Sequence, residues 1–353
     1  MSRKLCKVVV MLLVSVSSLH AQDIHFSQFY ENGILRNPAL TGIFSGDYKA
    51  GVNYRTQWGS ISVPFQTVLA SAETRILVGR EVGDYLSVGV AATYDKAGTI
   101  SFNSMSIYPA INYNKALADG HRSYLSVGFT GGFIQRSFDL SKATFSSQYL
   151  NGEFNQVAAT GENIQNVSMN AYDLGAGVSY NSTVGPSRNV NFYIGAAAFH
   201  VTRPKQSFAG ESDMLRLDTK FAGNVGVRAT FDNHFGMTAH LNYTRQGTYR
   251  ELIAGGLASW QNSSEKIQNF VLYAGIFVRF KDAIIPTVKV DYNQYSLTAS
   301  YDLNTSSLKP ATHGMAGYEL SLYIRGRYKK SSMSGAQVQC PRFEQMMNQD
   351  VDF

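Results

Sequence analysis

Hydrophobic and polar side chains alternate along most of this chain with a period of two residues, in blocks of about ten residues. The apolar positions of one block are Leu86, Val88, Val90, Ala92 and Tyr94, separated by Ser87, Gly89, Ala91 and Thr93. Similar blocks lie at 125–133, 221–231, 235–244 and 318–328. Because successive side chains of a strand point to opposite faces, each block predicts a strand with one apolar face and one polar or very small face.

These blocks predict about fourteen strands. They lie near 47–58, 65–78, 84–95, 102–115, 122–138, 170–181, 189–201, 218–231, 235–245, 248–260, 269–280, 284–292, 294–303 and 316–328. After residue 22 there is no long apolar stripe with the period of a helix, and no apolar run approaches the roughly eighteen residues of a membrane-spanning helix. The chain is therefore predicted to be all-β.

Two all-β folds fit this alternation. In a soluble β-sandwich the apolar faces would meet each other; in a transmembrane barrel they would meet lipid. The strands are long for a sandwich, and aromatic residues often stand at the ends of their apolar faces, as in the interfacial girdles of outer-membrane barrels. These aromatic residues are Tyr94, Tyr113, Tyr180, Phe231, Tyr243, Phe280, Tyr301 and Tyr328. We therefore predict an antiparallel outer-membrane β-barrel of about fourteen strands.

The lengths of the connections agree with such a barrel. If the first strand starts in the periplasm, the connections after odd-numbered strands lie outside the cell, and the two longest, near 139–169 and 202–217, both follow odd strands. Pro109 and Pro286 fall inside predicted strands, where each removes a backbone donor. We expect bulges or strand ends near the rim at both prolines.

The first residues have the three parts of a secretory signal: the positive Arg3, Lys4 and Lys7, an apolar run at 8–16, and the small residue Ala21. We expect residues 1–21 to be a signal peptide, 22–45 an N-terminal segment that lines or plugs the lumen, 46–328 the barrel, and 329–353 a polar periplasmic tail. One cysteine, Cys340, follows the signal, so no disulfide within the mature chain is expected.

Composition narrows the functional classes. Of the 353 residues 16% are charged, against about 25% in typical globular domains. Removal of the signal lowers the formal net charge from +6 to +3, and the basic residues are scattered, which argues against nucleic-acid binding. The aromatic content, 12%, argues against disorder.

No pattern of catalytic or metal-binding residues is present. The seven histidines are dispersed, and HExxH, GxSxG, P-loop and complete GxGxxG motifs are absent, so we expect no enzyme, no metal and no cofactor. Six arginines fall on or near strands: Arg55, Arg75, Arg228, Arg279, Arg325 and Arg327. An arginine on the lipid face costs roughly 2–4 kcal/mol at mid-membrane, so those deep in a strand should point inward and pair with carboxylates such as Glu73 or Glu319.

Several segments carry a family resemblance. Gln22–Trp58 (QDIHFSQFYENGILRNPALTGIFSGDYKAGVNYRTQW) resembles the opening of the PorP/SprF family of type IX secretion system membrane proteins of Bacteroidetes. Phe145–Asn155, Gly195–Phe208 with His200, Arg203 and Pro204, Thr248–Leu252, Gly317–Leu322 and the CPRF element Cys340–Phe343 are similar to further segments of that family.

The resemblance implies a non-enzymatic outer-membrane component of type IX secretion, in some members of gliding-adhesin delivery. Its implied partners are peptidoglycan-linked periplasmic proteins, other secretion components, secreted adhesin cargo and membrane lipid. Three elements are candidate plug or partner-binding sites: Asn37 and Pro38, Arg203 and Pro204, and Cys340, Pro341, Arg342 and Phe343.

Each candidate also has a structural interpretation. The first is a fixed turn that packs the N-terminal segment, the second a rigid loop start with a snorkelling arginine, and the third a clasp of the tail on the rim. An outer-membrane channel for solutes or hydrophobic substrates, like fatty-acid transporters, is the alternative function, and a soluble β-sandwich adhesin is the third.

Overall fold

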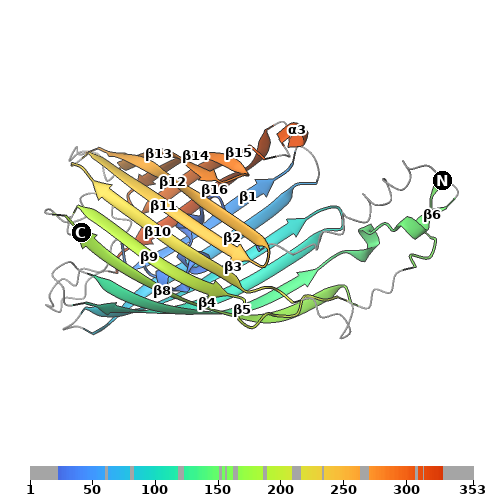
Figure 1. Ribbon diagram of the computed structural model, residues 1–353, viewed down its shortest axis with the longest axis horizontal. Coiled ribbons are helices and arrows are strands. Elements are labelled where there is room, and N and C mark those ends of the chain that lie inside the picture. The colour runs from blue at the N-terminus through green and yellow to red at the C-terminus, as the bar shows by residue number, and fades with distance from the viewer. Residues whose placement is uncertain are drawn as a thin grey trace, which may run out of the picture.

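Fourteen strands close into one antiparallel barrel in the computed structural model of the chain (Figure 1). The structure describes residues 23–59, 63–79, 83–117, 123–150, 153–155, 157–161, 166–185, 189–208, 216–232, 234–262, 270–306, 309–312 and 314–328. The barrel strands are β1 (Tyr48–Gln57), β2 (Phe65–Gly79), β3 (Asp84–Ala97), β4 (Phe102–Ala116), β5 (Tyr124–Ser137), β8 (Ser168–Val184), β9 (Val190–Phe199), β10 (Lys220–Thr230), β11 (Phe235–Gln246), β12 (Tyr249–Gln261), β13 (Phe270–Arg279), β14 (Ala283–Tyr292), β15 (Tyr295–Asn304) and β16 (Met315–Gly326).

Each strand pairs with its neighbours in sequence, and β1 closes the barrel against β16, from Tyr48 opposite Gly326 to Gln57 opposite Gly317. All fourteen expected strands are present, with bounds that differ from the expected ones by about three residues at most. The predicted fold is thus confirmed, and the β-sandwich is wrong. Within the described residues, none of the helices has the length and apolar character needed to cross a bilayer.

The two faces of the wall differ as the alternation predicts. Outward side chains such as Val52, Val90 and Phe129 are 49%, 40% and 55% exposed, whereas the inward Asn53 and Asn112 are 1% and 0% exposed. Six of the eight aromatic residues expected at strand ends lie exposed on the outer face: Tyr94, Tyr113, Phe231, Tyr243, Phe280 and Tyr328. Tyr180 and Tyr301 are half-buried.

The barrel has two unlike rims. The long-loop rim carries the connections 138–167, 200–219 and 305–314, and the short-turn rim carries tight turns such as 293–294 together with the start of β1 and the end of β16. The two connections expected to be longest therefore share one rim, as predicted. Bacterial barrels generally carry their long loops outside the cell, which is the side expected for this rim.

The two prolines interrupt the barrel differently from the prediction. Opposite Pro109 the β4–β5 pairing runs from Ile107–Phe133 directly to Ala110–Thr130, and no register shift accompanies the gap. Pro286 leaves the same kind of gap between β14 and β15. The expected bulges are thus wrong: a missing donor leaves the ladder locally unpaired, while the flanking pairs keep the register.

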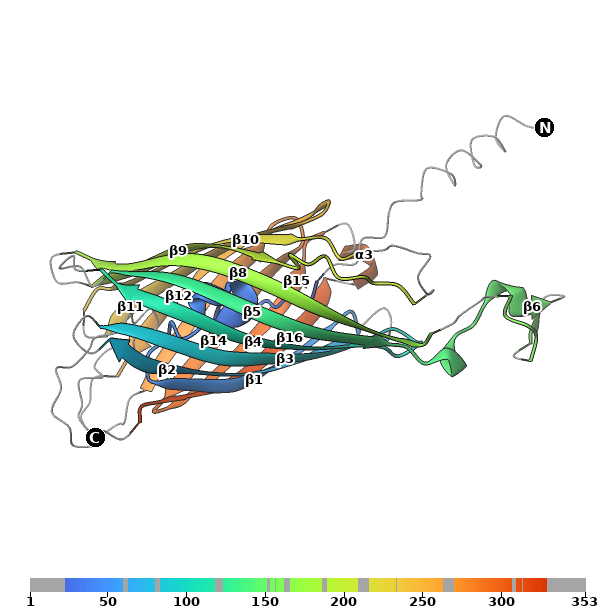
Figure 2. The ribbon, with the colours of Figure 1, turned by 90° about the horizontal axis from the view of Figure 1, so that it is seen from below.

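The connection between β5 and β8 forms an arm, residues 138–167, that stands away from the long-loop rim (Figures 1 and 2). Its elements are η3 (Leu140–Lys142), η4 (Ser146–Gln148), β6 (Tyr149–Leu150) and β7 (Glu153–Phe154). The base of the arm is closed by a backbone hydrogen bond from Phe138 N to Val167 O (3.1 Å). A second rim element, α3 (Lys309–Thr312), precedes β16.

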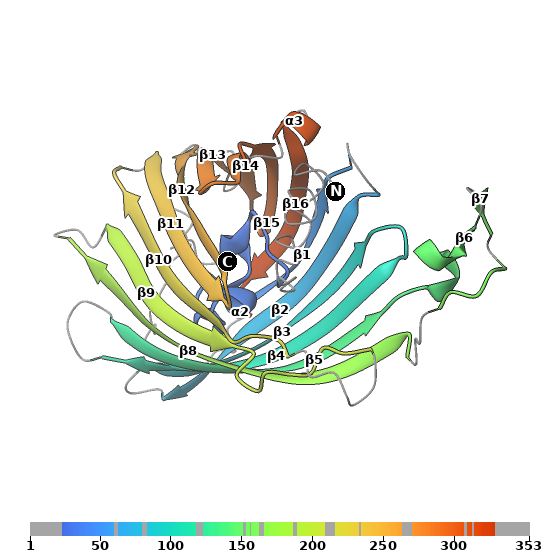
Figure 3. The ribbon, with the colours of Figure 1, turned by 45° about the vertical axis from the view of Figure 1, so that its right-hand side comes forward.

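Residues 23–47, here called the inner segment, lie inside the barrel and contain η1 (Phe29–Glu31), α2 (Gly33–Arg36) and η2 (Pro38–Leu40) (Figure 3). Two apolar clusters join this segment to the wall. Phe29 and Tyr30 pack with Phe277 and Ile285, and Phe26 and Ile34 pack with a second group around Leu69, Tyr108 and Ile134. The core of the molecule is therefore the space that the barrel encloses.

Candidate functional site

The inner segment folds by its own capping groups. Asn32 Oδ1 accepts a hydrogen bond from Leu35 N (3.0 Å) at the start of α2, and Asn37 Oδ1 accepts one from Ala39 N (2.9 Å) at the start of η2. Both are N-cap contacts that satisfy otherwise unpaired amides. Pro38 occupies the first position of η2, where its missing N–H costs nothing.

Asn37 also fixes this turn to the wall. Its Nδ2 donates to the carbonyl of Val178 (3.1 Å), the carbonyl of Ala196 (3.3 Å) and Oδ1 of Asn224 (2.8 Å). Space for it comes from glycines of β8 and β9: a Cβ on Gly177 would lie 2.0 Å from Asn37 Oδ1. The predicted turn residue is thus seated between three strands and 0% exposed.

Pro38 lies against β5 in the same way. A Cβ on Gly128 would lie 2.3 Å from the backbone carbon of Pro38 and 2.4 Å from Ala39 N. Asn112 Nδ2 of β4 donates to the carbonyls of Ala39 (2.9 Å) and Thr41 (2.8 Å). Gly128, which has no side chain, and the amide of Asn112 therefore form the site on the wall into which this turn fits.

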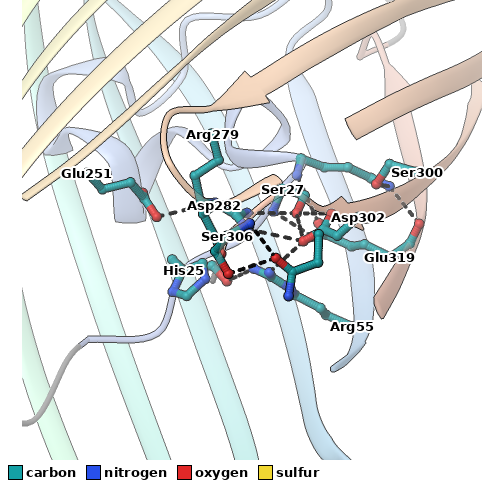
Figure 4. Close-up of polar contacts among 12 residues, drawn as sticks. His25, Ser27, Arg55, Glu251, Arg279, Asp282, Ser300, Asp302, Ser306 and Glu319 are labelled. Atoms are coloured by element: carbon teal, nitrogen blue, oxygen red, sulfur yellow. Dashed lines mark hydrogen bonds and ion pairs between the residues drawn. The ribbon is translucent and has the colours of Figure 1, made fainter. Parts of the chain in front are cut away.

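Buried charges hold the first part of the inner segment (Figure 4). Asp302 of β15 lies between two arginines, 2.9 Å from Arg55 Nη2 and 3.2 Å from Arg279 Nη1, and it accepts a hydrogen bond from Ser27 Oγ (2.6 Å). Arg279 also pairs with Glu251 (3.3 Å). The carboxylate thus links two wall strands to the segment inside.

Backbone groups of the segment are recognised as well. Ser27 N donates to Glu319 Oε2 (2.7 Å), and Arg55 donates to the carbonyl of His25. Burial and the nearby guanidinium groups of Arg55 and Arg279 hold the pKa of His25 well below its usual range. His25 is therefore neutral at the side of this cationic pair.

Glu31 in the middle of the segment is 0% exposed and faces two lysines of the wall. Lys289 Nζ lies 2.6 Å from its Oε1, and Lys49 Nζ donates to its backbone carbonyl (2.6 Å). A buried carboxylate is stable only when it is paired and hydrogen-bonded. Both lysines occupy inward-facing positions of strands in which buried and exposed residues alternate, Lys49 in β1 and Lys289 in β14.

Arg36 provides the reverse arrangement, a cation on the segment and acceptors on the wall. It donates to Asn242 Oδ1 (3.3 Å), to the carbonyl of Leu241 (3.0 Å) and to the hydroxyl of Tyr193. Its guanidinium carbon also lies 4.9 Å from the ring centre of Phe29, within the range of a cation–π contact.

The two ends of the inner segment lie at opposite rims. Asp23 contacts Lys220, the first residue of β10, and His200, just after β9, both at the long-loop rim. At the other end, Asp47 N donates to the carbonyl of Gly326, the last residue of β16 (2.7 Å). The segment therefore runs through the barrel from the long-loop rim to the short-turn rim.

His200 joins the segment to the wall at the long-loop rim. Its Nδ1 lies 2.6 Å from Asp173 and its Nε2 lies 3.3 Å from Asp23. Burial opposes the charged imidazolium, but Asp23 and Asp173 outweigh it and raise the pKa of His200. Burial likewise opposes ionisation of Asp23, but Lys220 and His200 hold its pKa well below the usual range.

Five of the six strand arginines point inward as predicted: Arg55, Arg75, Arg228, Arg279 and Arg325. Arg327 is exposed beyond the end of β16. The partners differ in detail from those expected, because Arg55 and Arg279 pair with Asp302 and Glu251. Glu73 and Glu319 accept hydrogen bonds from backbone amides of the inner segment, Gly42 N (2.9 Å) and Ser27 N.

The other predicted site residues lie apart from this interior. Arg203 is on the long-loop rim in a left-handed conformation (φ 46°), and its half-exposed side chain pairs with Asp218 (3.2 Å). The adjacent Pro204 is buried, and its carbonyl accepts a hydrogen bond from Leu217 N (2.9 Å). Cys340, Pro341, Arg342 and Phe343 lie outside the described residues, as do the expected signal and tail.

Two small cavities lie between the segment and the wall. One cavity, beside Arg36 and His240, measures about 30 Å³, and another, beside His25 and Glu251, about 70 Å³. These are volumes for a few water molecules at most. Among the described residues no group of three or more histidine, cysteine, aspartate or glutamate side chains is arranged to hold a metal ion.

Comparison with known sequences identifies one family. Residues 18–323 match the family described as "Type IX secretion system membrane protein PorP/SprF". No curated protein matches the sequence.

Solved structures with a similar arrangement are distant in sequence. A FadL homologue from Pseudomonas aeruginosa has 9% identity and a TM-score of 0.47, covering 81% of this chain and 91% of its own. The toluene transporter TodX from Pseudomonas putida has 9% identity and a TM-score of 0.46, with 82% and 91% covered. CdiB from Acinetobacter baumannii has 9% identity and a TM-score of 0.42; 79% of this chain is covered, and it spans 60% of the CdiB chain.

Proposed function

The chain belongs to the PorP/SprF family of type IX secretion system membrane proteins, and on that premise we propose that it is a non-enzymatic outer-membrane component of type IX secretion that acts through protein contacts at its two rims. The periplasmic machinery would bind the short-turn rim and the tail that follows it. Secreted cargo, adhesins among them, would meet the long-loop rim.

The observation that carries this proposal is that the inner segment occupies the interior of the barrel (Figure 3). The inner segment runs from rim to rim and is tied to the wall by buried ion pairs on Glu31 and Asp302. A pore for solutes needs a continuous space, whereas the cavities beside the segment measure about 30 and 70 Å³. This arrangement favours a scaffold over the alternative, a channel for solutes or hydrophobic substrates.

Placement in the outer membrane follows from physical reasoning. A closed barrel leaves no unpaired strand edge, which is why barrels can cross a bilayer. Its outward band of apolar side chains with exposed aromatic residues at the strand ends suits contact with lipid. A secretory signal at residues 1–21 would deliver the chain to the periplasm first.

The arm is the proposed contact surface for cargo. Its side chains Tyr149 and Val157 are 62% and 94% exposed, and they lie beyond the membrane wall. Because they project from the barrel, these apolar side chains are accessible to a protein partner. The arm is also built mainly on its own hydrogen bonds, such as Gln148 Nε2 to the carbonyl of Ala158 (3.3 Å).

The test compares cells that lack the protein with cells that carry one of two complementing versions, the full chain and a chain with 140–166 replaced by a short glycine–serine turn. Because Phe138 and Val167 are hydrogen-bonded neighbours, this excision leaves the barrel closed. We expect the deletion strain to lose type IX-secreted proteins from its surface and medium, the full chain to restore them, and the shortened chain to fail.

Uptake of small solutes and of fatty acids by the same strains is the control. Unchanged secretion in the deletion strain, together with reduced uptake, would overturn the proposal in favour of a channel. Full restoration by the shortened chain would leave the secretion role standing and remove the arm from it.

A further inference from the structure

The lipid-facing wall is not uniform: an open apolar depression lies across β4, β5 and β8. The depression measures about 490 Å³ and is open on the side that faces away from the barrel. It is lined by Pro109, Ala110, Ile111, Phe129, Thr130, Gly131, Leu174, Gly175, Ala176 and Val201. It lies outside the barrel interior described above.

The sequence creates this depression by omitting side chains. Gly131 is an outward position of β5, and a Cβ placed there would meet nothing within 4 Å. The outward positions beside it are the small Ala176 and the ring of Pro109, where the β4–β5 ladder is interrupted. Exposed large side chains surround the gap, with Phe129 and Leu174 at 55% and 57%.

From inside, the gap is closed by buried residues. Thr130 donates from its Oγ1 to the carbonyl of Pro109 (2.8 Å), and Tyr108 is 8% exposed among the apolar residues that pack on the inner segment. A Cβ on Gly132 would lie 2.6 Å from the Tyr108 ring, so wall and ring are in close contact. The depression therefore opens to the membrane and not to the lumen.

The position of the depression identifies what covers it. Its rim residues belong to the outward apolar band that faces lipid, so acyl chains are the groups that lie against it. The depression extends from the middle of β4 and β5, at Pro109 and Gly131, to Val201 just after β9, so it opens toward the long-loop rim and an acyl chain reaches it from the outer leaflet. Beyond it stands the aromatic pair Phe133 and Tyr172 (5.6 Å between ring centres), where interfacial aromatic residues are expected.

We propose that this depression binds one acyl chain of an outer-leaflet lipid as a resident ligand, with the headgroup beside Thr202 and Arg203. Burial of apolar surface gives no preference in a bilayer, because lipid tails are as apolar as the wall. An empty gap, however, deprives its lining of dispersion contacts, and a chain that fills it restores them. The bound lipid therefore differs from the surrounding lipids in the additional dispersion contacts that its acyl chain makes with the depression.

The test counts lipid bound to the purified full-length barrel by native mass spectrometry after addition of dipalmitoyl phosphatidylglycerol in mild detergent. Gly131→Leu fills the depression with a side chain. Gly223→Leu is the matched control, because Gly223 is also an outward glycine with nothing within 4 Å of a Cβ. We expect the wild type and Gly223→Leu to keep one lipid that Gly131→Leu loses under the same collision energy.

A second measurement uses the unaltered chain and a lipid with a diazirine in its acyl tail. Cross-links should concentrate on peptides containing 109–111, 129–131 and 174–176. Equal lipid retention by all three proteins, or cross-links spread evenly around the wall, would overturn the proposal. Recovery of another membrane protein at these peptides in cells would replace the lipid by a protein partner. None of these readouts involves secretion, so the proposed function stands or fails separately.

Discussion

Two segments of similar length, the inner segment and the arm, are not part of the strands that form the barrel wall. The first lies inside the barrel and the second projects from its rim, so their environments are opposite. In the inner segment Glu31, Asn37 and Thr41 are each 0% exposed. In the arm Tyr149 and Val157 are 62% and 94% exposed. Both segments contain short 3-10 helices capped by polar side chains, so local conformation does not distinguish them.

The difference lies in what faces each segment. The polar groups of the inner segment meet opposite or complementary groups of the wall, such as Lys289 for Glu31 and Asp302 for Ser27. Polar groups of the arm bond mainly within the arm and to its base, as Lys142 does with Asp139 (3.2 Å) and Ser101 (3.1 Å). Burial of a non-strand segment in this barrel is therefore decided by inward wall residues far away in sequence.

The largest expected effect comes from breaking the buried pairing. Asp302→Ala leaves Arg55 and Arg279 next to each other without the carboxylate between them, both with side chains 3% exposed or less. Removing one partner of a buried pair costs about 3–5 kcal/mol. Arg55 loses the carboxylate with which it pairs, whereas Arg279 keeps its ion pairs with Glu251 and Asp282. We expect the free energy of unfolding, measured by urea titration of the barrel in lipid vesicles, to fall by this amount.

Asp282→Ala is the matched control for that variant. Asp282 also pairs with Arg279 (3.1 Å), but its side chain is 49% exposed. Exposed ion pairs contribute about 1 kcal/mol or less, so the control should unfold almost like the wild type. A similar loss in both variants would mean that the inner segment is not held by its buried charges.

The next effect concerns the seat of the Asn37 turn. Gly128→Ala places a Cβ at 2.3 Å from the backbone of Pro38, and backbone cannot move aside as a flexible side chain can. Overpacking of this kind costs typically about 1–3 kcal/mol. We expect a lower free energy of unfolding and faster proteolysis of the inner segment in the folded barrel.

Gly131→Ala, three residues along the same strand, controls for loss of a strand glycine. Its Cβ meets nothing within 4 Å on the lipid face. Proteolysis of the inner segment at the wild-type rate in Gly128→Ala would show that the Pro38 turn is not closely seated.

The sequence predicts the barrel wall far better than the contacts between the wall and the inner segment. Alternation places all fourteen strands and directs Arg55 and Arg279 inward, because a lipid-facing charge is costly and strand geometry leaves one other direction. The turn at Asn37 and Pro38 is equally visible, since its caps are local. Both predictions depend on neighbours within a few residues.

What could not be predicted depends on distant pairs. Ser27 and Asp302 are 275 positions apart, and Glu31 and Lys289 are 258 apart. No periodicity links such residues, because the angle of the inner segment within the barrel decides which wall side chain it meets. The bulge predicted at Pro109 was wrong for a related reason. A missing backbone donor predicts that the ladder is disturbed, but it does not predict whether the register shifts.

A smaller effect, dependent on pH, is expected where the inner segment reaches the long-loop rim. His200 has a raised pKa, so its charge stabilises the folded state fully below its unfolded value of about 6.5, and the contribution is lost as the pH rises through the folded value. His200→Gln keeps a donor for Asp173 but removes the charge. The variant should unfold about 1 kcal/mol more easily than the wild type at pH 5.5 and equally at high pH.

The contribution of Asp23 to the stability of this cluster depends on pH in the opposite direction. Its pKa lies well below the usual range, so its contribution is present above the unfolded value of about 3.9 and is lost only in strong acid. A difference between wild type and His200→Gln that grows with pH would contradict the assigned charge of His200.

The smallest effect is expected from removing the arm. Replacement of 140–166 by a short turn removes exposed groups and contacts within the arm, while the Phe138–Val167 hydrogen bond and the strands below it remain. Loss of surface elements away from a packed core changes stability by about 0.5 kcal/mol or less. Urea titration should give the wild-type midpoint and slope, while Asp302→Ala shifts the midpoint strongly. A large shift on excision would mean that the arm contributes to the barrel, and the contrast between the two segments would then be one of degree.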